Sequence, residues 1–227
     1  MQTKLTDMSY QSSQSSLFPP VVKHLIIINV CMWVSAWVLN RAGVCDLNNL
    51  LGMHYWKSEQ FNLVQLASYM FMHDLRDFQH ILFNMFALWM FGKDIEYALG
   101  SKRFLLYYTV CGIGAGLIQQ LAWMFDLSQL PVIQQYYLQD LLVTVGASGA
   151  VFGLLLAFAI LFPQASIYLF FIPIPIRAPY FVAGYAILEL FFGIQGSSDG
   201  VAHFAHLGGM IFGGLLLFVW KKRNQLY

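Results

Sequence analysis

Long apolar runs separated by short polar segments dominate the sequence. A membrane-spanning helix needs about 20 mostly apolar residues. Six stretches approach this length: residues 22–39, 80–98, 104–125, 141–162, 178–194 and 201–220. The second and the fifth are the weakest, because they are short or have charged residues at their ends. The pattern predicts an all-α membrane protein, a bundle of six transmembrane helices.

The longest connection, residues 40–79, contains the apolar run FNLVQLASYMFM. Its length of about a dozen residues is too short for a span, so we expect it to lie in the membrane interface or to fold back. Residues 1–21 are polar and rich in Ser and Gln, and we predict a flexible cytoplasmic tail there. The spanning domain is then predicted over 22–220, followed by a basic cytoplasmic end over 221–227.

The Lys and Arg residues predict the orientation, because cytoplasmic segments of membrane proteins are enriched in them. With a cytoplasmic N-terminus, the inner segments hold Lys4, Lys23, Lys93, Lys102, Arg103, Arg177, Lys221, Lys222 and Arg223. The outer segments hold only Arg41, Lys57 and Arg76. Both termini are therefore predicted to be cytoplasmic, and the large first loop is predicted to lie on the outer side.

Composition supports the membrane class and excludes others. Of the 227 residues, 59% are hydrophobic and 10% are charged, whereas a soluble domain has roughly 25% charged residues. A net charge of +1 gives no reason to expect binding to nucleic acid. Three cysteines, Cys31, Cys45 and Cys111, fit neither a disulfide framework nor metal-ligand spacing. We expect no metal and no cofactor.

Four polar side chains fall inside the predicted membrane layer. With the predicted orientation, the second, fourth and sixth spans all begin on the outer side. His80 and Asn84 open the second span four residues apart, on one helix face. We expect Ser148 about two turns into the fourth span and His206 about a turn and a half into the sixth; at 1.5 Å per residue these depths agree to within roughly 10 Å.

Small residues recur at every fourth position beside the serine and the histidine. The two stripes are Gly149, Gly153 and Ala157 in the fourth span and Ala205, Gly209 and Gly213 in the sixth. Such stripes allow helix backbones to approach closely in lipid. Close packing of the two helices would bring the hydroxyl of Ser148 within reach of the imidazole of His206.

Each polar residue also has a structural interpretation. A serine in a stripe of small residues commonly bonds a backbone carbonyl, and Asn84 would make an interhelical hydrogen bond. His80 and His203 lie close enough to the interface to be solvated. Separate structural roles do not explain why all these groups are predicted at a similar membrane depth, on spans that all begin on the outer side. We therefore favour a functional site.

A serine hydroxyl beside an imidazole is the minimal arrangement for acyl transfer. The ring takes the hydroxyl proton as the oxygen attacks a carbonyl, then returns it to the leaving amine. A third, acidic member is not evident, because Asp140 and Asp199 lie outside the deep layer and Glu189 has no assigned neighbour. We therefore predict a dyad of Ser148 and His206.

The tetrahedral intermediate carries a negative oxygen, which needs preorganised donors contributing on the order of 3 kcal/mol each. The candidates are Nδ2 of Asn84, the backbone N–H of Ser148 and the ring of His80. Phe152, one turn after Ser148, could give His206 an apolar face.

These motifs together resemble those of the rhomboid intramembrane serine proteases. The matching segments are HILFN at 80–84, GASGAVFG at 146–153 and AHLGGMIFG at 205–213. EYALGS at 96–101 is similar to the Glu-x-x-Leu-Gly-Ser turn of that family. The resemblance extends over residues 22–220 and implies a rhomboid-like bundle.

The resemblance also implies roles for individual residues. Ser148 corresponds to the nucleophile and His206 to the general base and acid. Asn84 and His80, with the Ser148 amide, correspond to the lining of the oxyanion hole, and Phe152 to an aromatic residue against the histidine. The supporting glycines would be Gly146, Gly149 and Gly209.

Two features of the first loop depart from the family pattern. Family members often have a histidine five residues before the oxyanion histidine, where this chain has Leu75; the nearest histidine is His73. A Trp-Arg pair common in the family corresponds to Val64 and Gln65. Neither departure affects the dyad.

The resemblance implies an endopeptidase that cleaves single-span transmembrane proteins near their outer end. Such a substrate must enter from the lipid bilayer, and the short fifth span, preceded by FIPIPIRAPY, is our candidate for a lateral gate. A six-span form without further domains suggests a bacterial inner (plasma) membrane.

Two other functions remain open at this point. The main alternative is a catalytically idle rhomboid-like protein that binds membrane proteins, although a binder needs neither Ser148 nor His206. The second is a transporter of protons or metal ions that uses His80, His203, His206 and Glu189. The sequence shows no inverted repeat, and a metal site would not require glycines around the serine.

Overall fold

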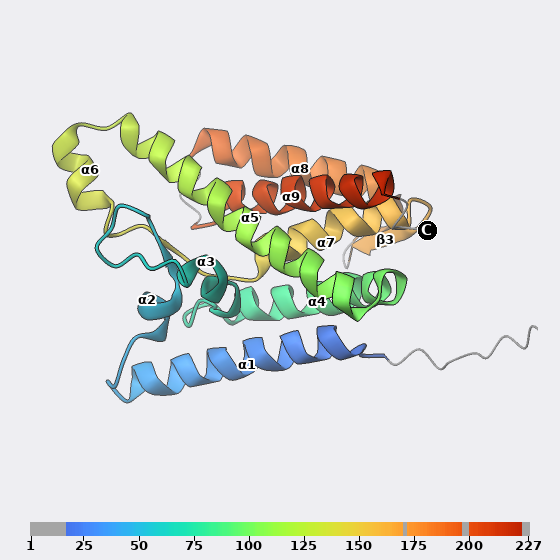
Figure 1. Cartoon of the computed structure of the whole chain (residues 1–227), viewed down its shortest axis with the longest axis horizontal. Coiled ribbons are helices and arrows are strands. Elements are labelled where there is room, and N and C mark those ends of the chain that lie inside the picture. The colour runs from blue at the N-terminus through green and yellow to red at the C-terminus, as the bar shows by residue number, and fades with distance from the viewer. Residues whose placement is uncertain (1–16, 170–171, 197–199, 224–227) are drawn as a thin grey trace, which may run out of the picture.

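The structure is a computed structural model that describes residues 17–169, 172–196 and 200–223. The described chain is mostly helical (Figure 1). Its helices are α1 (Pro20–Arg41), α2 (Leu47–Leu51), α3 (Gln65–Ser68), the 3₁₀ turn Tyr69–Phe71, α4 (Phe78–Leu99), α5 (Ser101–Ser128), α6 (Val132–Leu138), α7 (Ser148–Leu161), α8 (Ala178–Gln195) and α9 (His203–Lys222). Most of the predicted tail at 1–21 and the last residues of the predicted basic end lie outside the described residues.

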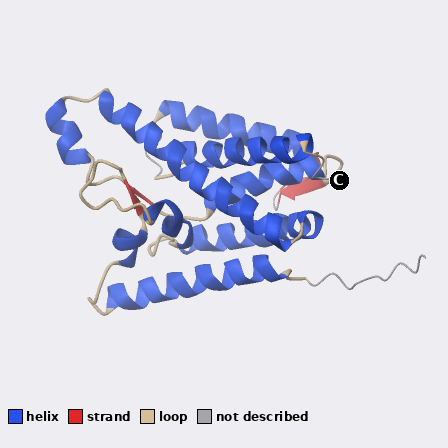
Figure 2. Cartoon of the chain, viewed as in Figure 1, coloured by secondary structure: helices blue, strands red, loops and turns tan. Residues whose placement is uncertain are grey.

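Two short antiparallel strand pairs join the helices (Figure 2). They are β1 (Met53–His54) with β2 (Val143–Thr144), and β3 (Ser166–Leu169) with β4 (Ile172–Arg177). The second pair lies at the end of the bundle where α1 begins and α9 ends (Figure 1). The first pair ties the loop after α1 to the segment that precedes α7.

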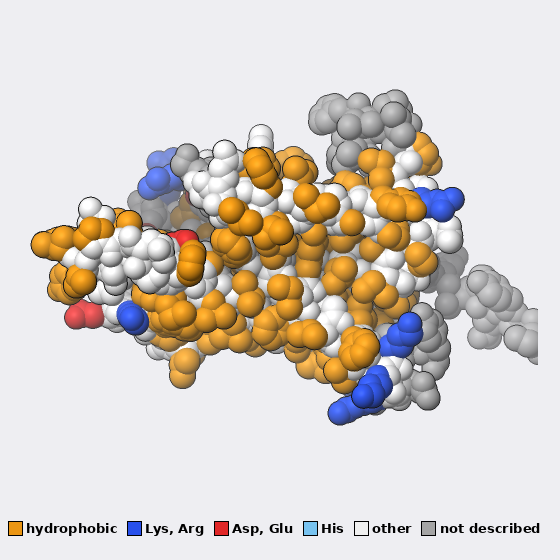
Figure 3. Space-filling view, turned by 90° about the horizontal axis from the view of Figure 1, so that it is seen from above, with side chains coloured by type: hydrophobic (Ala, Val, Ile, Leu, Met, Phe, Trp, Pro, Cys, Tyr) orange, Lys and Arg blue, Asp and Glu red, His pale blue; other side chains and the backbone are white. Residues whose placement is uncertain are grey.

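Four described helices are long and apolar enough to cross a membrane: α1, α5, α8 and α9. α4 has sufficient length but carries Lys93, Asp94 and Glu96, and α7 has only 14 residues. Hydrophobic side chains cover the middle of the surface in Figure 3, and basic side chains gather at its ends. The protein is therefore a mostly helical membrane protein, while the six-span count and the orientation stay predictions.

Helices α5, α7 and α9 pack against one another and form the centre of the bundle. α1 lies along α4 on one side, and α8 lies on α9 on the other (Figure 1). In the most apolar 18-residue stretch of α5, 56% of the residues are buried, against 17% in that of α8. α8 is therefore a peripheral helix with much of its surface turned outward.

Helix α7 is shorter than the span predicted over 141–162. Residues 141–147 are not helical: Met53 pairs with Thr144 in the β1–β2 strand pair, and the Gly146 N–H donates to the Tyr69 carbonyl at 2.9 Å. The backbone of Gly146 has φ +132°, which a helix does not allow. The prediction that Ser148 lies two turns into the helix is therefore wrong, because Ser148 is the first residue of α7.

Helix α7 is shorter than a full membrane span. Fourteen residues make a helix of about 21 Å, whereas the hydrocarbon core of a bilayer is about 30 Å thick. The apolar residues before α7 enter the protein as extended chain and supply no further helical turn. The N-terminus of α7 is consequently buried inside the bundle.

Backbone contact joins α7 to α9. A Cβ placed on Gly209 would lie 1.8 Å from the carbonyl oxygen of Gly149. On the next turn, a Cβ on Gly153 would lie 2.4 Å from Sγ of Cys111 on α5. The stripes of small residues thus bring the helices together as the sequence predicts, with α5 packed against the same seam.

Glu96 attaches α1 to the end of α4. Its carboxylate accepts the backbone N–H groups of Val21 at 3.0 Å and Val22 at 2.8 Å. It also accepts the hydroxyl of Ser101 at 2.6 Å. A carboxylate at the N-terminus of α1 satisfies amides that have no partner within the helix and complements the helix dipole. The acid and the serine of EYALGS therefore have a structural role.

The apolar run at 61–72 does not span, as expected, and folds against the bundle. It contains α3 and the 3₁₀ turn, and the Tyr69 hydroxyl donates to the carbonyl of Gly112 on α5 at 2.7 Å. The side chain of Gln65, also in this run, is buried. The first loop therefore forms a packed base for the segment before α7.

We predict that Gly209→Ala destabilises the protein by at least about 2 kcal/mol, because the new methyl group would meet a backbone oxygen that cannot move aside. Gly184→Ala is the matched control: it lies in α8 with no atom within 4 Å of the added Cβ. Thermal unfolding in mild detergent should show a large decrease in Tm for the first variant alone. Equal Tm values would show that the α7–α9 contact is not close.

Candidate active site

Ser148 and His206 are joined by a hydrogen bond between α7 and α9. Nε2 of His206 lies 2.8 Å from Oγ of Ser148. Ser148 is the first residue of α7, and His206 lies in the first turn of α9. The imidazole is buried and the serine is half-buried. The pair has the distance required for proton transfer between a hydroxyl and a base.

An aromatic face fixes the plane of the histidine. The ring of Phe152 stacks on His206 with 4.1 Å between the centroids and 6° between the planes. The ring of Tyr185 on α8 packs in turn against Phe152, with 4.9 Å between the ring centroids. Because Phe152 is one turn after Ser148, a single helix carries the hydroxyl and the surface that orients its partner.

The other nitrogen of His206 faces a buried carboxylate. Nδ1 of His206 lies 2.9 Å from Oε2 of Glu189 on α8. Nδ1 of His203 lies 2.7 Å from the same oxygen. All three side chains are buried. Sequence reasoning left Glu189 unplaced and judged a third, acidic member not evident, whereas the structure shows an acid next to the histidine.

A signal for this contact exists in the sequence. Glu189 is the only acidic residue in the predicted span 178–194, and an ionisable group within a membrane requires a partner. It lies six residues before the end of α8, while His206 lies three after the start of α9. Consecutive antiparallel helices place these positions at similar depth, so His203 and His206 were the natural candidates.

His80 shares a small space with Ser148. A Cβ on Gly146 would lie 2.8 Å from Nε2 of His80 and 3.7 Å from Oγ of Ser148. Nδ1 of His80 accepts the backbone N–H of Asp74 at 3.3 Å. A neutral imidazole that accepts at Nδ1 carries its proton on Nε2. His80 therefore presents an N–H donor toward Gly146.

Asn84 is bonded within its own helix. Its Nδ2 donates to the backbone carbonyl of His80 at 2.9 Å, and its buried Oδ1 has no partner among the described residues. In the part of the chain that the structure describes, no hydrogen bond joins its side chain to Ser148. The structure thus brings His80, Ser148 and His206 together and leaves Asn84 one turn below His80.

The start of α7 supplies backbone donors. The first residues of a helix have N–H groups without intrahelical acceptors, and the helix dipole adds partial positive charge there. In α7 the first helical backbone hydrogen bond runs from the Val151 N–H to the Ala147 carbonyl. The amides of Ser148 and the two residues that follow therefore have no acceptor within α7.

His73 lies behind His80 in the first loop. Its ring is fully buried, and the centroids of the two rings are 5.1 Å apart. Burial, together with the neighbouring His80, lowers the pKa of His73 to about 3. His73 lies two residues before Leu75, the position at which rhomboids often have a histidine, and its ring still packs on His80.

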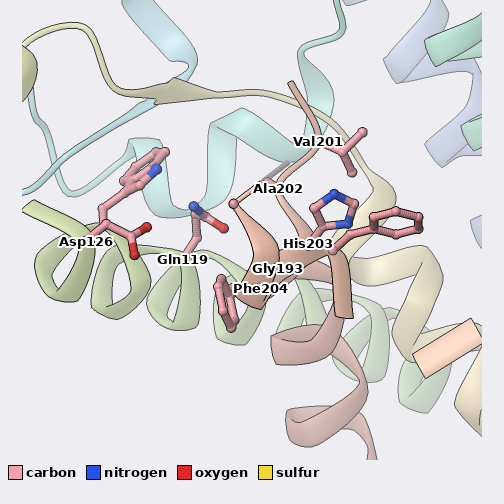
Figure 4. A pocket seen from close by; sticks show the side chains of 10 residues that line it. Gln119, Asp126, Gly193, Val201, Ala202, His203 and Phe204 are labelled. Atoms are coloured by element: carbon pink, nitrogen blue, oxygen red, sulfur yellow. The ribbon is translucent and has the colours of Figure 1, made fainter. Parts of the chain in front are cut away.

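Two hollows adjoin the site without containing Ser148. One of about 190 Å³ lies between α5, α8 and α9 and is lined by Gln119, Asp126 and His203 among others (Figure 4). A larger one of about 500 Å³ separates α4 from α8 and is mainly apolar. Its lining includes Phe86 and Met90 of α4, and Phe181 and Tyr185 of α8.

Glu189, His203 and His206 are also the described residues best placed to hold a metal ion, since their ligand atoms lie within 4.8 Å of one another. A zinc ion would require about 2.0–2.2 Å to each ligand, with the ion between them. Here Oε2 of Glu189 itself occupies the position between the two Nδ1 atoms, at hydrogen-bond distances. The geometry favours direct hydrogen bonds.

Sequence comparison relates the chain to known proteins. A profile of the rhomboid domain matches residues 60–223. The chain is 33% identical to Rhomboid protein 1, mitochondrial, of Saccharomyces cerevisiae, over 64% of the chain and 38% of that protein. It is 29% identical to RHOMBOID-like protein 12, mitochondrial, of Arabidopsis thaliana, over 83% and 55%. It is 30% identical to Rhomboid protease AarA of Providencia stuartii, over 60% and 49%.

The chain therefore spans about half or less of these curated relatives. Two of the three carry "mitochondrial" in their names, so the comparison gives no support to the bacterial plasma membrane predicted from the sequence. The apolar helices support the coarser statement that this is a membrane protein.

We predict that His73 makes the protein less stable in acid. The unfolded chain binds a proton at His73 below pH of about 6.5, whereas the folded protein does so only near 3, so stability is lost as the pH falls between these values. Between pH 7 and 5, the free energy of unfolding should decrease by about 2 kcal/mol more in the wild type than in His73→Phe. Denaturant titrations in detergent measure this difference, and parallel pH profiles would contradict it.

Proposed function

The chain belongs to the rhomboid family, and we propose that it is an intramembrane serine endopeptidase that works through an acyl-enzyme. The observation that carries the proposal is the 2.8 Å contact between Oγ of Ser148 and Nε2 of His206, at the buried start of α7. A family profile that matches most of the chain supports the class of reaction, and the site geometry supports its residues.

In the proposed reaction, Oγ of Ser148 attacks the carbonyl carbon of the scissile peptide bond as Nε2 of His206 takes the hydroxyl proton. The C–N bond then breaks, and His206 returns this proton to the leaving amine. A water molecule, activated by the same nitrogen, attacks the ester and releases the carboxylate product with Ser148 restored. Phe152 keeps the imidazole plane fixed throughout.

We assign stabilisation of the oxyanion to the amide of Ser148 and to the Nε2–H of His80, whose ring lies beside Gly146. Each such donor contributes on the order of 3 kcal/mol in other acyl-transfer enzymes. Asn84 is a third candidate: a rotation of its side chain would free Nδ2 from the His80 carbonyl and turn it toward the substrate. The helix dipole of α7 adds to the same field.

The substrate in this proposal is a single-span membrane protein, cut near its outer end. A transmembrane helix hides its peptide bonds, because every backbone group is bonded within the segment. In the predicted orientation the start of α7 lies below the outer membrane surface, so an unwound segment could reach Ser148 there. The apolar hollow between α4 and α8 is the lateral entrance that we propose, with α8 as the gate.

A catalytically idle rhomboid-like protein that binds membrane proteins is the alternative. Binding alone would not need a serine hydroxyl held at 2.8 Å from an imidazole, with a stacked ring and a carboxylate behind it. We propose that the protein lies in a membrane with its site toward the outer face. That this membrane is a bacterial plasma membrane stays a prediction.

We predict that a fluorophosphonate probe labels the detergent-solubilised wild type and fails to label Ser148→Ala and His206→Ala. The first variant lacks the nucleophile and the second lacks the base. Both should also fail to cut a reporter transmembrane segment. Ser128→Ala, an exposed serine at the end of α5, is the control and should behave as the wild type. An idle binder would show no labelling in any variant, and labelling that survives His206→Ala would exclude the histidine as the base.

We predict that cross-linking α4 to α8 blocks cleavage of a membrane substrate and leaves probe labelling unchanged. Cysteines replacing Met90 and Phe181, which line opposite sides of the apolar hollow, can be joined by a bifunctional reagent after Cys31, Cys45 and Cys111 have been replaced. A small probe reaches Ser148 without passing between the helices. Each single cysteine treated with the same reagent is the control, and unchanged substrate cleavage in the cross-linked protein would exclude this gate.

A further inference from the structure

We propose that Glu189 is the positioning residue of the site: its carboxylate holds the proton of His206 on Nδ1, so that Nε2 is free to act as the base. This inference rests on the proposed function and adds a third member to the dyad. It is carried by the 2.9 Å contact between Oε2 of Glu189 and Nδ1 of His206, at a position buried from solvent.

The hydrogen bonds themselves define the tautomer. An ionised carboxylate only accepts hydrogen bonds, so an imidazole nitrogen that contacts it must carry the hydrogen. One oxygen of Glu189 contacts two Nδ1 atoms, those of His203 and His206. Even a protonated carboxyl has a single hydrogen and could donate to only one of them. With Glu189 ionised, both rings are Nδ1–H donors, and Nε2 of His206 presents its lone pair to Ser148.

His203 supports this arrangement from the same helix. It lies one turn before His206 and provides the second donor to Oε2 of Glu189 at 2.7 Å. The ring of Phe192 stacks on it with 5.6 Å between centroids. A buried carboxylate is costly unless several donors satisfy it. Two imidazole donors let Glu189 remain ionised in the bundle and fix the position of its oxygen.

The carboxylate also has an electrostatic effect on the reaction. When His206 takes the proton of Ser148, the ring becomes an imidazolium, and an anion 2.9 Å away stabilises that charge. The proton stays on His206 until the amine leaves, and Glu189 is not protonated. The other ionisable groups around the ring are His80 on α4, His203 on α9 and Tyr185 on α8.

A purely structural role is the competing explanation. Glu189 connects α8 to α9, and removing it could loosen a peripheral helix without changing the chemistry. The two roles differ in the quantity that changes. A structural bridge affects the fraction of folded protein, whereas a positioning residue affects the turnover rate of each folded molecule and the tautomer of His206.

The kinetic test uses Glu189→Gln, which removes the charge, and Glu189→Leu, which also removes the acceptor. We expect kcat per folded molecule, counted by size-exclusion chromatography and near-ultraviolet circular dichroism, to decrease about 10²-fold or more in both variants, since loss of the acid from a serine-protease triad costs up to 10⁴-fold. KM should stay within about twofold. Glu96→Gln is the matched control, because Glu96 is a buried carboxylate that bonds the start of α1 and Ser101 and has no contact with the described residues of the site; it should lower Tm and leave kcat unchanged.

The second readout does not depend on activity. ¹⁵N spectra of histidine-labelled protein, assigned by comparison with His206→Ala, should show the Nδ1–H tautomer of His206 in the wild type and the Nε2–H tautomer in Glu189→Leu. Wild-type Nε2–H, or unchanged kcat in both Glu189 variants, would overturn the inference. If the wild type itself fails to label or cleave, the proposed function fails, and the spectra still decide whether Glu189 sets the tautomer.

Discussion

The backbone contact between α7 and α9 is the constraint on which the site depends. No side chain can lie between Gly209 and the carbonyl oxygen of Gly149. Ser148 directly precedes one of these glycines, and His206 lies one turn before the other. A single seam of small residues therefore sets both the distance between the helices and the 2.8 Å distance between Oγ and Nε2.

The short length of α7 is the second feature that organises the molecule. Because non-helical chain enters the bundle before Ser148, the positive end of the helix lies within the protein, and its first amides have no acceptor within the helix. The first loop holds this segment through Tyr69 and the β1–β2 pair. The polar groups around Ser148 come from three other helices: His80 from α4, His206 from α9 and Glu189 from α8.

The sequence predicts the membrane class, the position of most helices and the resemblance to rhomboids, which the family profile confirms. Small-residue stripes and depth counting also bring Ser148 near His206. Hydropathy cannot show where α7 begins, because extended chain buried in a protein is as apolar as helix. Span patterns alone do not place Glu189, because its depth relative to His206 depends on how α8 and α9 lie antiparallel to each other.

The central claim is that Ser148 becomes acylated with His206 as its base. Intact-mass measurement of the fluorophosphonate-treated protein, followed by peptide mapping, tests it most directly. The account predicts one adduct per chain, carried by Ser148 at the start of α7. An adduct on a different residue, or an unchanged mass after prolonged treatment of folded protein, would contradict it.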